Sequence, residues 1–211
     1  MKRRIVMLLL FVCIICSVNA KAYKSLGSIG LGGGFESILS SDYGANTTSV
    51  VIGLFAYDQS KAESKTVFYV DGQFEIPMKI STGNYTVKRS DINPDTWMNV
   101  GLISGIAYKK NYSNVPLEAI IGAGLAFKED ALVVSTSYGN TGALELSLGL
   151  GVSVVTNYYF SDNFSVMFNV SQQYGILNWA WDANDKKFKS EDGVFRLSTA
   201  VRVGFGLSLI P

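Results

Sequence analysis

Hydrophobic and polar positions alternate along the last stretch of the chain, residues 195–209. One face carries Phe195, Leu197, Thr199, Val201, Val203, Phe205, Leu207 and Leu209, and the other carries Arg196, Ser198, Ala200, Arg202, Gly204, Gly206 and Ser208. Because side chains of a β-strand point to opposite sides with a period of 2, this pattern predicts one strand with an apolar face and a polar, glycine-rich face. A tilted strand needs about 9–11 residues to cross a bilayer, so this strand is long enough.

Seven earlier stretches show the same alternation, and no window of the chain after the first twenty residues favours helical spacing over it. They are residues 25–37, 46–57, 65–80, 97–109, 116–128, 142–159 and 164–174. The assignment of faces is weakest for residues 46–57, where apolar residues occur on both sides. The chain therefore has eight predicted strands.

The predicted connections alternate between short and long. The short ones are residues 58–64, 110–115 and 161–163, and the long ones are residues 38–45, 81–96, 129–141 and 175–193. Outer-membrane barrels have short periplasmic turns and longer external loops, and an even strand number puts both termini on the periplasmic side. The pattern predicts an all-β fold: a single antiparallel up-and-down eight-stranded transmembrane β-barrel.

Alternation alone leaves open a soluble, lipocalin-like barrel with its apolar face inside. The lumen of eight strands is just wide enough to be filled by side chains, and the apolar face carries too many large residues to fit there. The other face carries Gly30, Gly32, Gly34, Gly101, Gly105, Gly122, Gly124, Gly149, Gly151, Gly204 and Gly206, which would leave room for polar side chains. We therefore expect the polar face inside and the apolar face against lipid.

Aromatic residues gather near the predicted strand ends. Tyr57, Phe68, Tyr108, Tyr158, Tyr159 and Phe160 lie near short turns, and Trp97, Phe127, Tyr174, Trp179 and Phe195 lie near long loops. Two aromatic girdles at the membrane interfaces are typical of membrane barrels.

By strand number, alternation and loop lengths, the chain resembles the small eight-stranded outer-membrane barrels of the OmpX and opacity-protein type. The resemblance covers the whole mature chain. It implies a monomer in the cell outer membrane, with the lipid bilayer and, during insertion, the barrel-assembly machinery as partners. Such barrels usually end in an aromatic residue that the insertion machinery recognises, whereas this chain ends Leu209-Ile210-Pro211. Either the machinery reads a looser signal or Phe205 serves in its place.

The first twenty residues predict an export signal, which divides the chain into a signal peptide at 1–20 and a barrel domain at 21–211. A basic start is followed by an apolar run and by small residues that allow cleavage after Ala20 or Ala22. An uncleaved anchor and a lipoprotein site at Cys16 are the alternatives. Both cysteines, Cys13 and Cys16, lie in this segment, so the mature chain would have no thiol and no disulfide.

The composition argues against several functions. Removing Lys2, Arg3 and Arg4 from the 18 basic residues leaves 15 against 17 acidic ones, which argues against a nucleic-acid partner. The chain has no histidine, so we expect no histidine-dependent catalysis, no catalytic residues of that kind, no transition-metal site and no cofactor. The run Asp182-Ala183-Asn184-Asp185 resembles a calcium loop faintly, but Lys186 occupies a ligand position.

Nine inward charges form a candidate lumen network: Glu36, Asp71, Glu75, Lys109, Glu118, Lys128, Glu145, Arg196 and Arg202. The strand order predicts three pairs, Glu36 with Arg196, Lys128 with Glu145 and Lys109 with Glu118. It also places Arg202 opposite Asp71 and Glu75. The network could be an ion path or a solute site. We favour a neutralised plug that makes the barrel rigid, because an unpaired buried charge is costly.

The predicted long loops hold the candidate contacts with an external partner. These are Trp179 and Trp181 in the longest loop, with Tyr85, Lys88, Arg89 and Tyr138 elsewhere. Trp179 could equally be an interface anchor. The leading hypothesis is a non-enzymatic surface protein whose four external loops serve adhesion or contact with a host or the environment. The alternatives are a narrow channel or transporter for small, including hydrophobic, solutes, and a soluble periplasmic binder.

Overall fold

The structure, a computed structural model, describes residues 24–40, 44–59, 64–92, 94–136, 139–182 and 187–209. The predicted signal peptide at 1–20 and its cleavage sites lie outside the described residues, as do Ile210 and Pro211.

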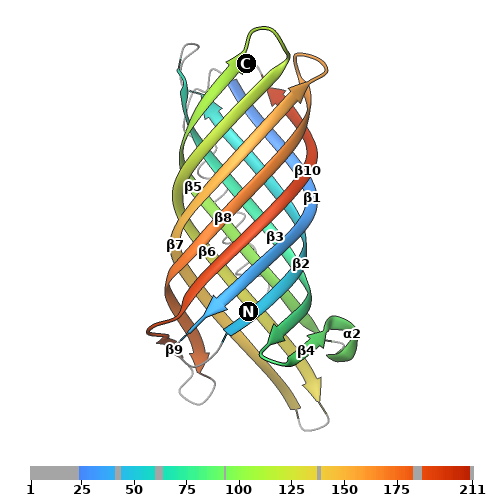
Figure 1. Ribbon diagram of the computed structural model, residues 1–211, viewed down its shortest axis with the longest axis vertical. Helices are drawn as coiled ribbons and strands as arrows, with labels where there is room; N and C mark the ends of the chain where they lie inside the picture. Colours follow the sequence, from blue (N-terminus) through green and yellow to red (C-terminus); the bar gives the residue numbers. More distant parts are fainter. Residues whose placement is uncertain are drawn as a thin grey trace.

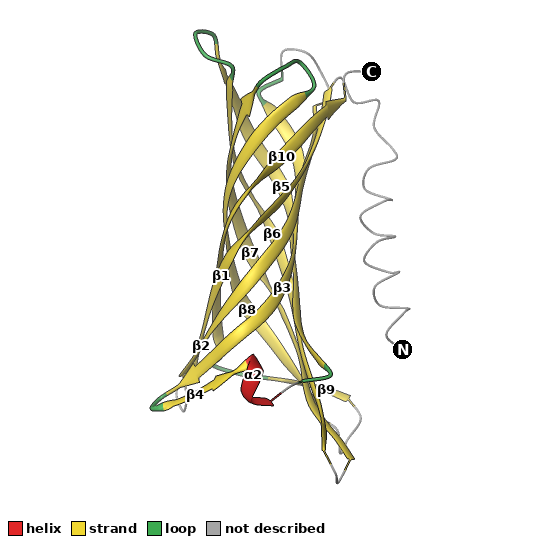
Figure 2. Ribbon diagram, turned by 90° about the vertical axis from the view of Figure 1, so that its right-hand side faces the viewer, coloured by secondary structure: helices red, strands yellow, loops and turns green. Residues whose placement is uncertain are grey.

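Eight long antiparallel strands form a closed barrel (Figures 1 and 2). They are β1 (Lys24–Leu39), β2 (Gly44–Gln59), β3 (Thr66–Thr82), β5 (Thr96–Tyr112), β6 (Leu117–Thr136), β7 (Gly139–Tyr159), β8 (Phe164–Asp182) and β10 (Phe195–Leu209). Each pairs with its neighbours in sequence order, and β10 pairs with both β8 and β1. The up-and-down eight-stranded topology predicted from the alternation is confirmed.

Short elements decorate the end of the barrel where the long connections lie, at the bottom of Figure 2. The strand β4 (Tyr85–Lys88) pairs with β3, the strand β9 (Lys187–Ser190) pairs with β8, and a single helical turn, α2 (Arg89–Ile92), follows β4. Among the described residues, no helix is both long enough and apolar enough to span a membrane.

Two of the predicted long loops are wrong, because strands occupy most of their residues. β6 runs on to Thr136 and β8 to Asp182, well beyond the predicted ends at residues 128 and 174. Backbone hydrogen bonds continue the ladder there. The apolar–polar alternation fades because both faces of a strand outside the membrane meet water, so the sequence pattern stops before the strand does.

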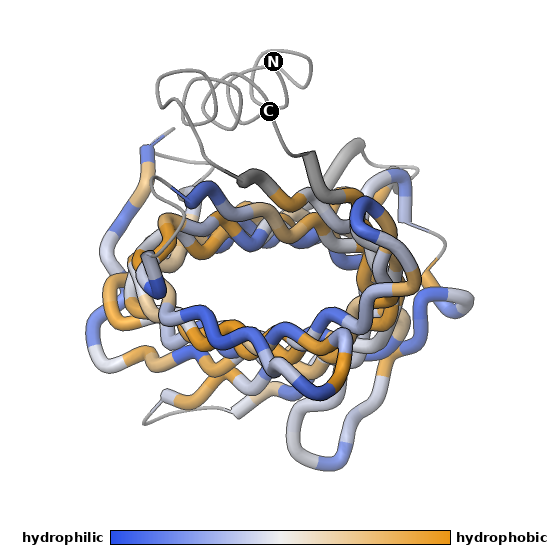
Figure 3. The backbone as a smooth tube through the Cα atoms, turned by 90° about the horizontal axis from the view of Figure 1, so that it is seen from above, coloured by the Kyte–Doolittle hydropathy of each residue, from blue (hydrophilic) through white to orange (hydrophobic). Residues whose placement is uncertain are grey.

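The apolar faces point outward, as predicted. Leu54 is 61% exposed and Leu125 is 66% exposed, whereas their neighbours Phe55 and Ala126 point inward and are buried. Hydrophobic and hydrophilic positions alternate along the strands around the closed ring (Figure 3). A continuous outward apolar surface of this kind would be costly in water and is the surface that lipid covers.

The lumen also holds an apolar cluster that the sequence pattern did not predict as a group. Its members are Leu26, Phe55, Tyr57, Val67, Tyr69, Ile103, Ala107, Ile120, Ala126, Val155 and Met167. Most of them lie in the half of the barrel that contains the start of β1 and the end of β2. The rings of Phe55 and Tyr69 stack with centroids 5.8 Å apart. Apolar packing therefore fills this half of the lumen.

Two residues expected in the aromatic girdles are buried inside the barrel instead, and Tyr159, also expected there, points inward as well. Tyr57 is 2% exposed and Trp97 is 6% exposed. Both have inward parity: each lies two residues from another inward-facing residue of its strand, Phe55 for Tyr57 and Asn99 for Trp97, and these two are also buried. Closeness to a strand end suggested a girdle position, but the period of 2 along the strand sets the direction of a side chain.

Candidate functional site

The candidate site is the chain of charges along the lumen, described here from one end to the other. The terminal end is where β1 begins and β10 ends, and the loop end is the opposite end, which carries β4, α2 and β9. Eight of the nine charges proposed from the sequence are at most 5% exposed, and Glu145, at the loop end, has a side chain that is 28% exposed. All nine point into the lumen, and they fall into three groups.

At the terminal end, Lys109 Nζ lies 3.7 Å from Glu118 Oε2, which is the predicted pair. The other contacts of the Glu118 carboxylate come from Tyr57 Oη at 2.9 Å, Tyr159 Oη at 3.0 Å and Asn157 Nδ2 at 3.2 Å, all donating to it. The Lys109 ammonium also donates to Gln59 Oε1. One cation and one carboxylate therefore cancel here, and every carboxylate oxygen has a donor.

In the middle of the barrel, Arg202 is fully buried and its Nη2 lies 2.5 Å from Asp71 Oδ1. The guanidinium also donates to Asn169 Oδ1 at 2.8 Å and to the carbonyl oxygen of Gly72 at 3.2 Å. Space for it comes from Gly53, where a Cβ atom would lie 1.7 Å from Arg202 Nη1, rather than from the expected Gly204 and Gly206. Arg202 thus spans the lumen from β10 to β3.

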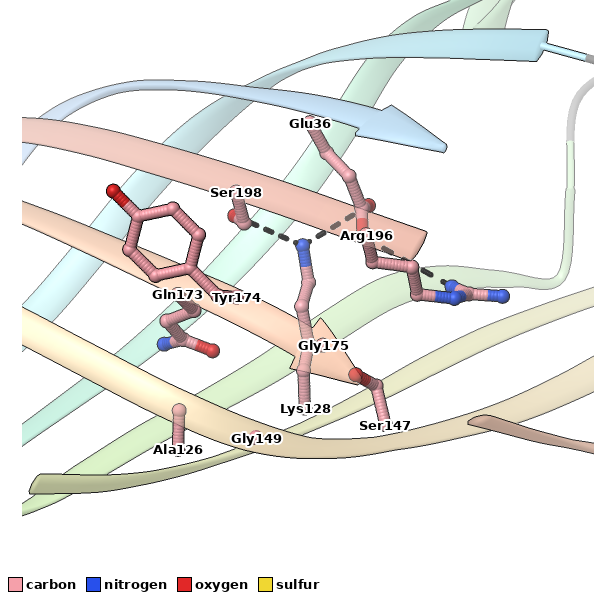
Figure 4. A pocket seen from close by; sticks show the side chains of 10 residues that line it. All are labelled: Glu36, Ala126, Lys128, Ser147, Gly149, Gln173, Tyr174, Gly175, Arg196 and Ser198. Carbon is pink, nitrogen blue, oxygen red and sulfur yellow. Dashed lines mark hydrogen bonds and ion pairs between the residues drawn. The ribbon is translucent and has the colours of Figure 1, made fainter. Parts of the chain in front are cut away.

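At the loop end, Lys128 points from β6 into the lumen toward Glu36 and Ser198 (Figure 4). Its Nζ lies 3.0 Å from Glu36 Oε2, 3.4 Å from Glu75 Oε1 and 3.8 Å from Asp130 Oδ1. It also donates to Ser198 Oγ at 3.1 Å. Glu75, which was expected opposite Arg202, is therefore a partner of Lys128.

Arg196 is the second cation of the loop end. Its Nη1 lies 2.6 Å from Asp130 Oδ2 and 3.9 Å from Glu36 Oε1, and its Nη2 contacts Glu145 and lies 3.6 Å from Glu191 Oε2. The predicted proximity of Glu36 and Arg196 is present. The predicted pair of Lys128 with Glu145 is wrong, because Arg196 reaches Glu145 and Lys128 lies deeper in the lumen.

Asp130 and Glu191 belong to this group and were missed from the sequence. Asp130 has the inward parity of Lys128, two residues before it, but it lay in a stretch interpreted as a loop. Glu191 follows β9 and reaches the lumen only because the chain folds back there, where its backbone N–H donates to the carbonyl oxygen of Asn178. The alternation along β6 could have identified Asp130 as an inward-facing residue, whereas no pattern in the sequence identifies Glu191 as a lumen residue.

The loop-end group is unbalanced in charge. Among the residues that the structure describes, the carboxylates of this group are Glu36, Glu75, Asp130, Glu145 and Glu191, and their ion pairs join them to two cations, Lys128 and Arg196. Burial raises the pKa of the Glu191 carboxyl above its usual value, and the negative charge of Glu145 adds to this effect against the opposing effect of Arg196. The group therefore carries a formal excess of three negative charges.

A cavity of about 140 Å³ lies at the loop end of the lumen, beside this group. Its lining combines acidic, polar and apolar side chains: Glu36, Ile38, Thr47, Ile80, Trp97, Asn99, Asp130, Ala131, Leu132, Ala143 and Glu145. A single water needs about 10–15 Å³ measured in this way, so the cavity holds more than isolated waters.

The candidate contacts on the external hairpins have different surroundings. Trp181 is 38% exposed and packs edge-on against Phe188 of β9, with ring centroids 5.2 Å apart. Trp179 is half-buried, and Tyr85 is 78% exposed at the β3–β4 turn. Arg89 is engaged, because its Nη1 donates to the carbonyl oxygen of Trp97 at 2.8 Å.

The remaining expectations in the loops fall largely outside the described residues. These include the side chain of Tyr138 and, in the faint calcium loop, Asn184 and Asp185. Within the described part of the chain, no group of three or more acidic side chains is arranged to hold a metal ion.

Comparison with protein families and with curated proteins finds no match for this chain. Solved structures of outer-membrane barrels do match it. OprG from Pseudomonas aeruginosa superposes with a TM-score of 0.59 at 12% identity, covering 91% of this chain and 98% of OprG. Neisserial surface protein A superposes with a TM-score of 0.50 at 16% identity, covering 88% of this chain and 97% of its own. The outer membrane protease OmpT from Escherichia coli superposes with a TM-score of 0.50 at 10% identity, covering 92% of this chain and 99% of OmpT.

The closed ring of eight strands, the outward apolar belt and these similarities define one class of protein. The chain has the fold of a small integral β-barrel of the outer membrane, embedded in the lipid bilayer. Identities this low concern the fold and do not transfer a specific activity.

Proposed function

We propose that this chain is a non-enzymatic surface protein of the outer membrane, whose barrel is a rigid scaffold for external hairpins. The observation that carries the proposal is the closure of the lumen at mid-depth. Arg202 and Asp71 join β10 to β3 across the lumen, and the apolar cluster fills the half beyond them. A barrel filled in this way supports loops better than it conducts.

The loop end offers exposed hairpins on which a partner could bind. The pair of Trp181 and Phe188 is fixed by strand pairing between β8 and β9, and the Asn178 side chain donates to the carbonyl oxygen of Val194 at 2.7 Å at the base of this segment. Exposed aromatic side chains held on a rigid frame favour contact with another molecule. We propose adhesion, or contact with a host or the environment, through these hairpins.

The non-enzymatic part of the proposal rests on chemistry. The fold itself is compatible with catalysis, since OmpT is named a protease. This chain has no histidine to serve as a base near neutral pH. The buried carboxylates of the lumen contact cations, as Asp71 contacts Arg202 and Glu36 contacts Lys128. Such engaged groups are poor general acids and bases.

The remaining parts of the proposal follow the class of fold. We propose a monomer that is exported by a signal peptide at 1–20, inserted by the barrel-assembly machinery, and oriented with the terminal end in the periplasm and the loop end outside. The lipid bilayer is its environment.

Orientation is testable because both cysteines lie in the predicted signal peptide. A single cysteine at Ser190 in β9 should react with a membrane-impermeant maleimide on intact cells, whereas one at Ser113 in a short turn should react only after the cells are opened. Both positions are exposed. Equal labelling at both positions on intact cells would contradict the orientation.

Function is tested by attachment and by conductance. Cells that display the protein should attach to epithelial or matrix-coated surfaces more strongly than cells that display a Trp181→Ser, Phe188→Ser variant. Purified protein should give no steady single-channel steps in a planar bilayer. Regular steps would instead support the narrow channel or small-solute transporter.

A further inference from the structure

The cavity at the loop end of the lumen has a lining that a scaffold does not require. Its walls come from six strands, β1, β2, β3, β5, β6 and the start of β7, and the cavity between them measures about 140 Å³. The side chains of Asp130 and Glu145 are 16% and 28% exposed, so water reaches the acidic side of the cavity.

The charge of this region favours a cation. Three of the five loop-end carboxylates, Glu36, Asp130 and Glu145, line the cavity itself. Lys128 and Arg196 contact these carboxylates but are outnumbered by them, which leaves the formal excess of three negative charges. A buried carboxylate without a compensating charge is costly, so a bound cation would stabilise the group.

One carboxylate oxygen at the cavity accepts no hydrogen bond. Glu36 Oε1 receives no hydrogen bond within the described residues, although the residue is only 2% exposed. Asn99, which is 3% exposed, also lines the cavity and brings a side-chain amide to its wall. Buried polar atoms normally have a hydrogen-bond partner, so Glu36 Oε1 points to a polar occupant of the cavity.

The rest of the lining is apolar and aromatic. The indole of Trp97 lies on the wall together with Ile38, Ile80 and Leu132. An indole face attracts cations, and aliphatic side chains match methyl or methylene groups. A metal ion would need several oxygen ligands at close range, and no group of three acidic side chains in the described part of the chain provides them.

We propose that this cavity binds a small organic cation, an ammonium group on a short apolar body. The ammonium group would lie against Trp97 and the carboxylates of Asp130 and Glu145, and its methyl or methylene groups would contact Ile38, Ile80 and Leu132. This proposal goes beyond the scaffold function and does not depend on adhesion through the hairpins.

Choline is a suitable probe, because 3,3-dimethyl-1-butanol has nearly the same shape without the charge. Calorimetric titration of the purified protein in octyl glucoside, a detergent without a choline group, should detect choline binding in the millimolar range or tighter. The neutral alcohol should bind about tenfold more weakly or not at all, since a tenfold difference matches one cation–π or ionic contact. Sodium chloride keeps the ionic strength equal in both titrations.

Three variants locate the site. Trp97→Leu and Glu145→Gln should each weaken choline binding about tenfold. Glu129→Gln is the matched control, since Glu129 precedes Asp130 but has the outward parity of β6, and its binding should be unchanged. Heat-modifiable gel mobility shows that each variant is folded.

Several results would overturn the proposal. These are no choline binding at about 10 mM, equal binding of choline and the neutral alcohol, or equal weakening by Glu145→Gln and Glu129→Gln. The comparison of choline with the alcohol uses the unmodified protein, so it remains decisive if a variant fails to fold. Loss of surface attachment in the hairpin variant with intact choline binding would separate this proposal from the scaffold function.

Discussion

The two ends of the lumen are filled in different ways. At the terminal end, apolar side chains such as Phe55, Tyr69 and Met167 pack together, and the single pair of Lys109 and Glu118 closes the end with its charges balanced. At the loop end, charged groups fill most of the space, carboxylates outnumber cations, and a cavity remains. One barrel thus contains a packed half and an open, acidic half.

This difference shows how an eight-stranded barrel can be rigid without being uniform. Apolar packing and a balanced ion pair stabilise the terminal half, whereas the excess of negative charge at the loop end costs stability. Arg202 lies at the boundary between the two halves. Sites that bind ligands are commonly less stable than the scaffold that holds them, and the loop half has this character.

The largest expected change in stability comes from Arg202, at the boundary between the two halves of the lumen. Arg202→Leu leaves Asp71 buried without its cation, which should lower the free energy of unfolding by about 3–5 kcal/mol. Urea unfolding in lipid vesicles measures this change. The double variant with Asp71→Leu should recover most of the loss, and a double variant as unstable as the single one would show that Arg202 does not act through Asp71.

The packed half should depend strongly on single apolar side chains. Phe55 is 1% exposed, so Phe55→Ala should cost about 3 kcal/mol, near the lower end for a buried aromatic residue. Thr47→Ala, on the cavity wall at the loop end, should cost less than about 1 kcal/mol because the cavity already leaves it poorly packed. Equal losses in urea unfolding would contradict the division into two halves.

The closing pair of the terminal end should contribute less than its apolar core. Glu118→Gln removes the charge that faces Lys109 and weakens three hydrogen bonds, so we expect a loss of about 2 kcal/mol. Glu118→Gln with Lys109→Met should be more stable than Glu118→Gln alone. A single variant as stable as the wild type would show that this pair does not hold the terminal end.

The smallest expected change in stability is at the loop end, where a substitution should stabilise the protein and not destabilise it. Burial raises the pKa of Glu191, so its ionised form is disfavoured in the folded protein, and Glu191→Gln should stabilise by up to about 0.5 kcal/mol at pH 7. Because ionisation causes the cost, the gain should vanish as the pH falls below about 4.3, the ordinary pKa of glutamate. Urea unfolding at pH 7 and pH 4 measures this, and a destabilised variant at pH 7 would contradict the acidic excess.

The alternation of residues by itself determined the eight strands, their order and the direction of most side chains. A period of 2 is a local property of a strand, so residues such as Val201 and Arg202 reveal their faces without knowledge of their neighbours. The same parity placed the nine lumen charges inside. Where parity was set aside for position along the strand, as for Tyr57 and Trp97, the prediction was wrong.

Only the tertiary structure decided which charges meet. Arg196 of β10 reaches past β8 to Glu145 of β7, Lys128 reaches Glu36 and Glu75, and Gly53 makes room for Arg202. These partners are separated by many residues along the chain, and their distances depend on the tilt and stagger of the strands. The sequence therefore determined the barrel and its two faces, and the closure of the strands determined the packed half, the acidic half and the cavity within the acidic half.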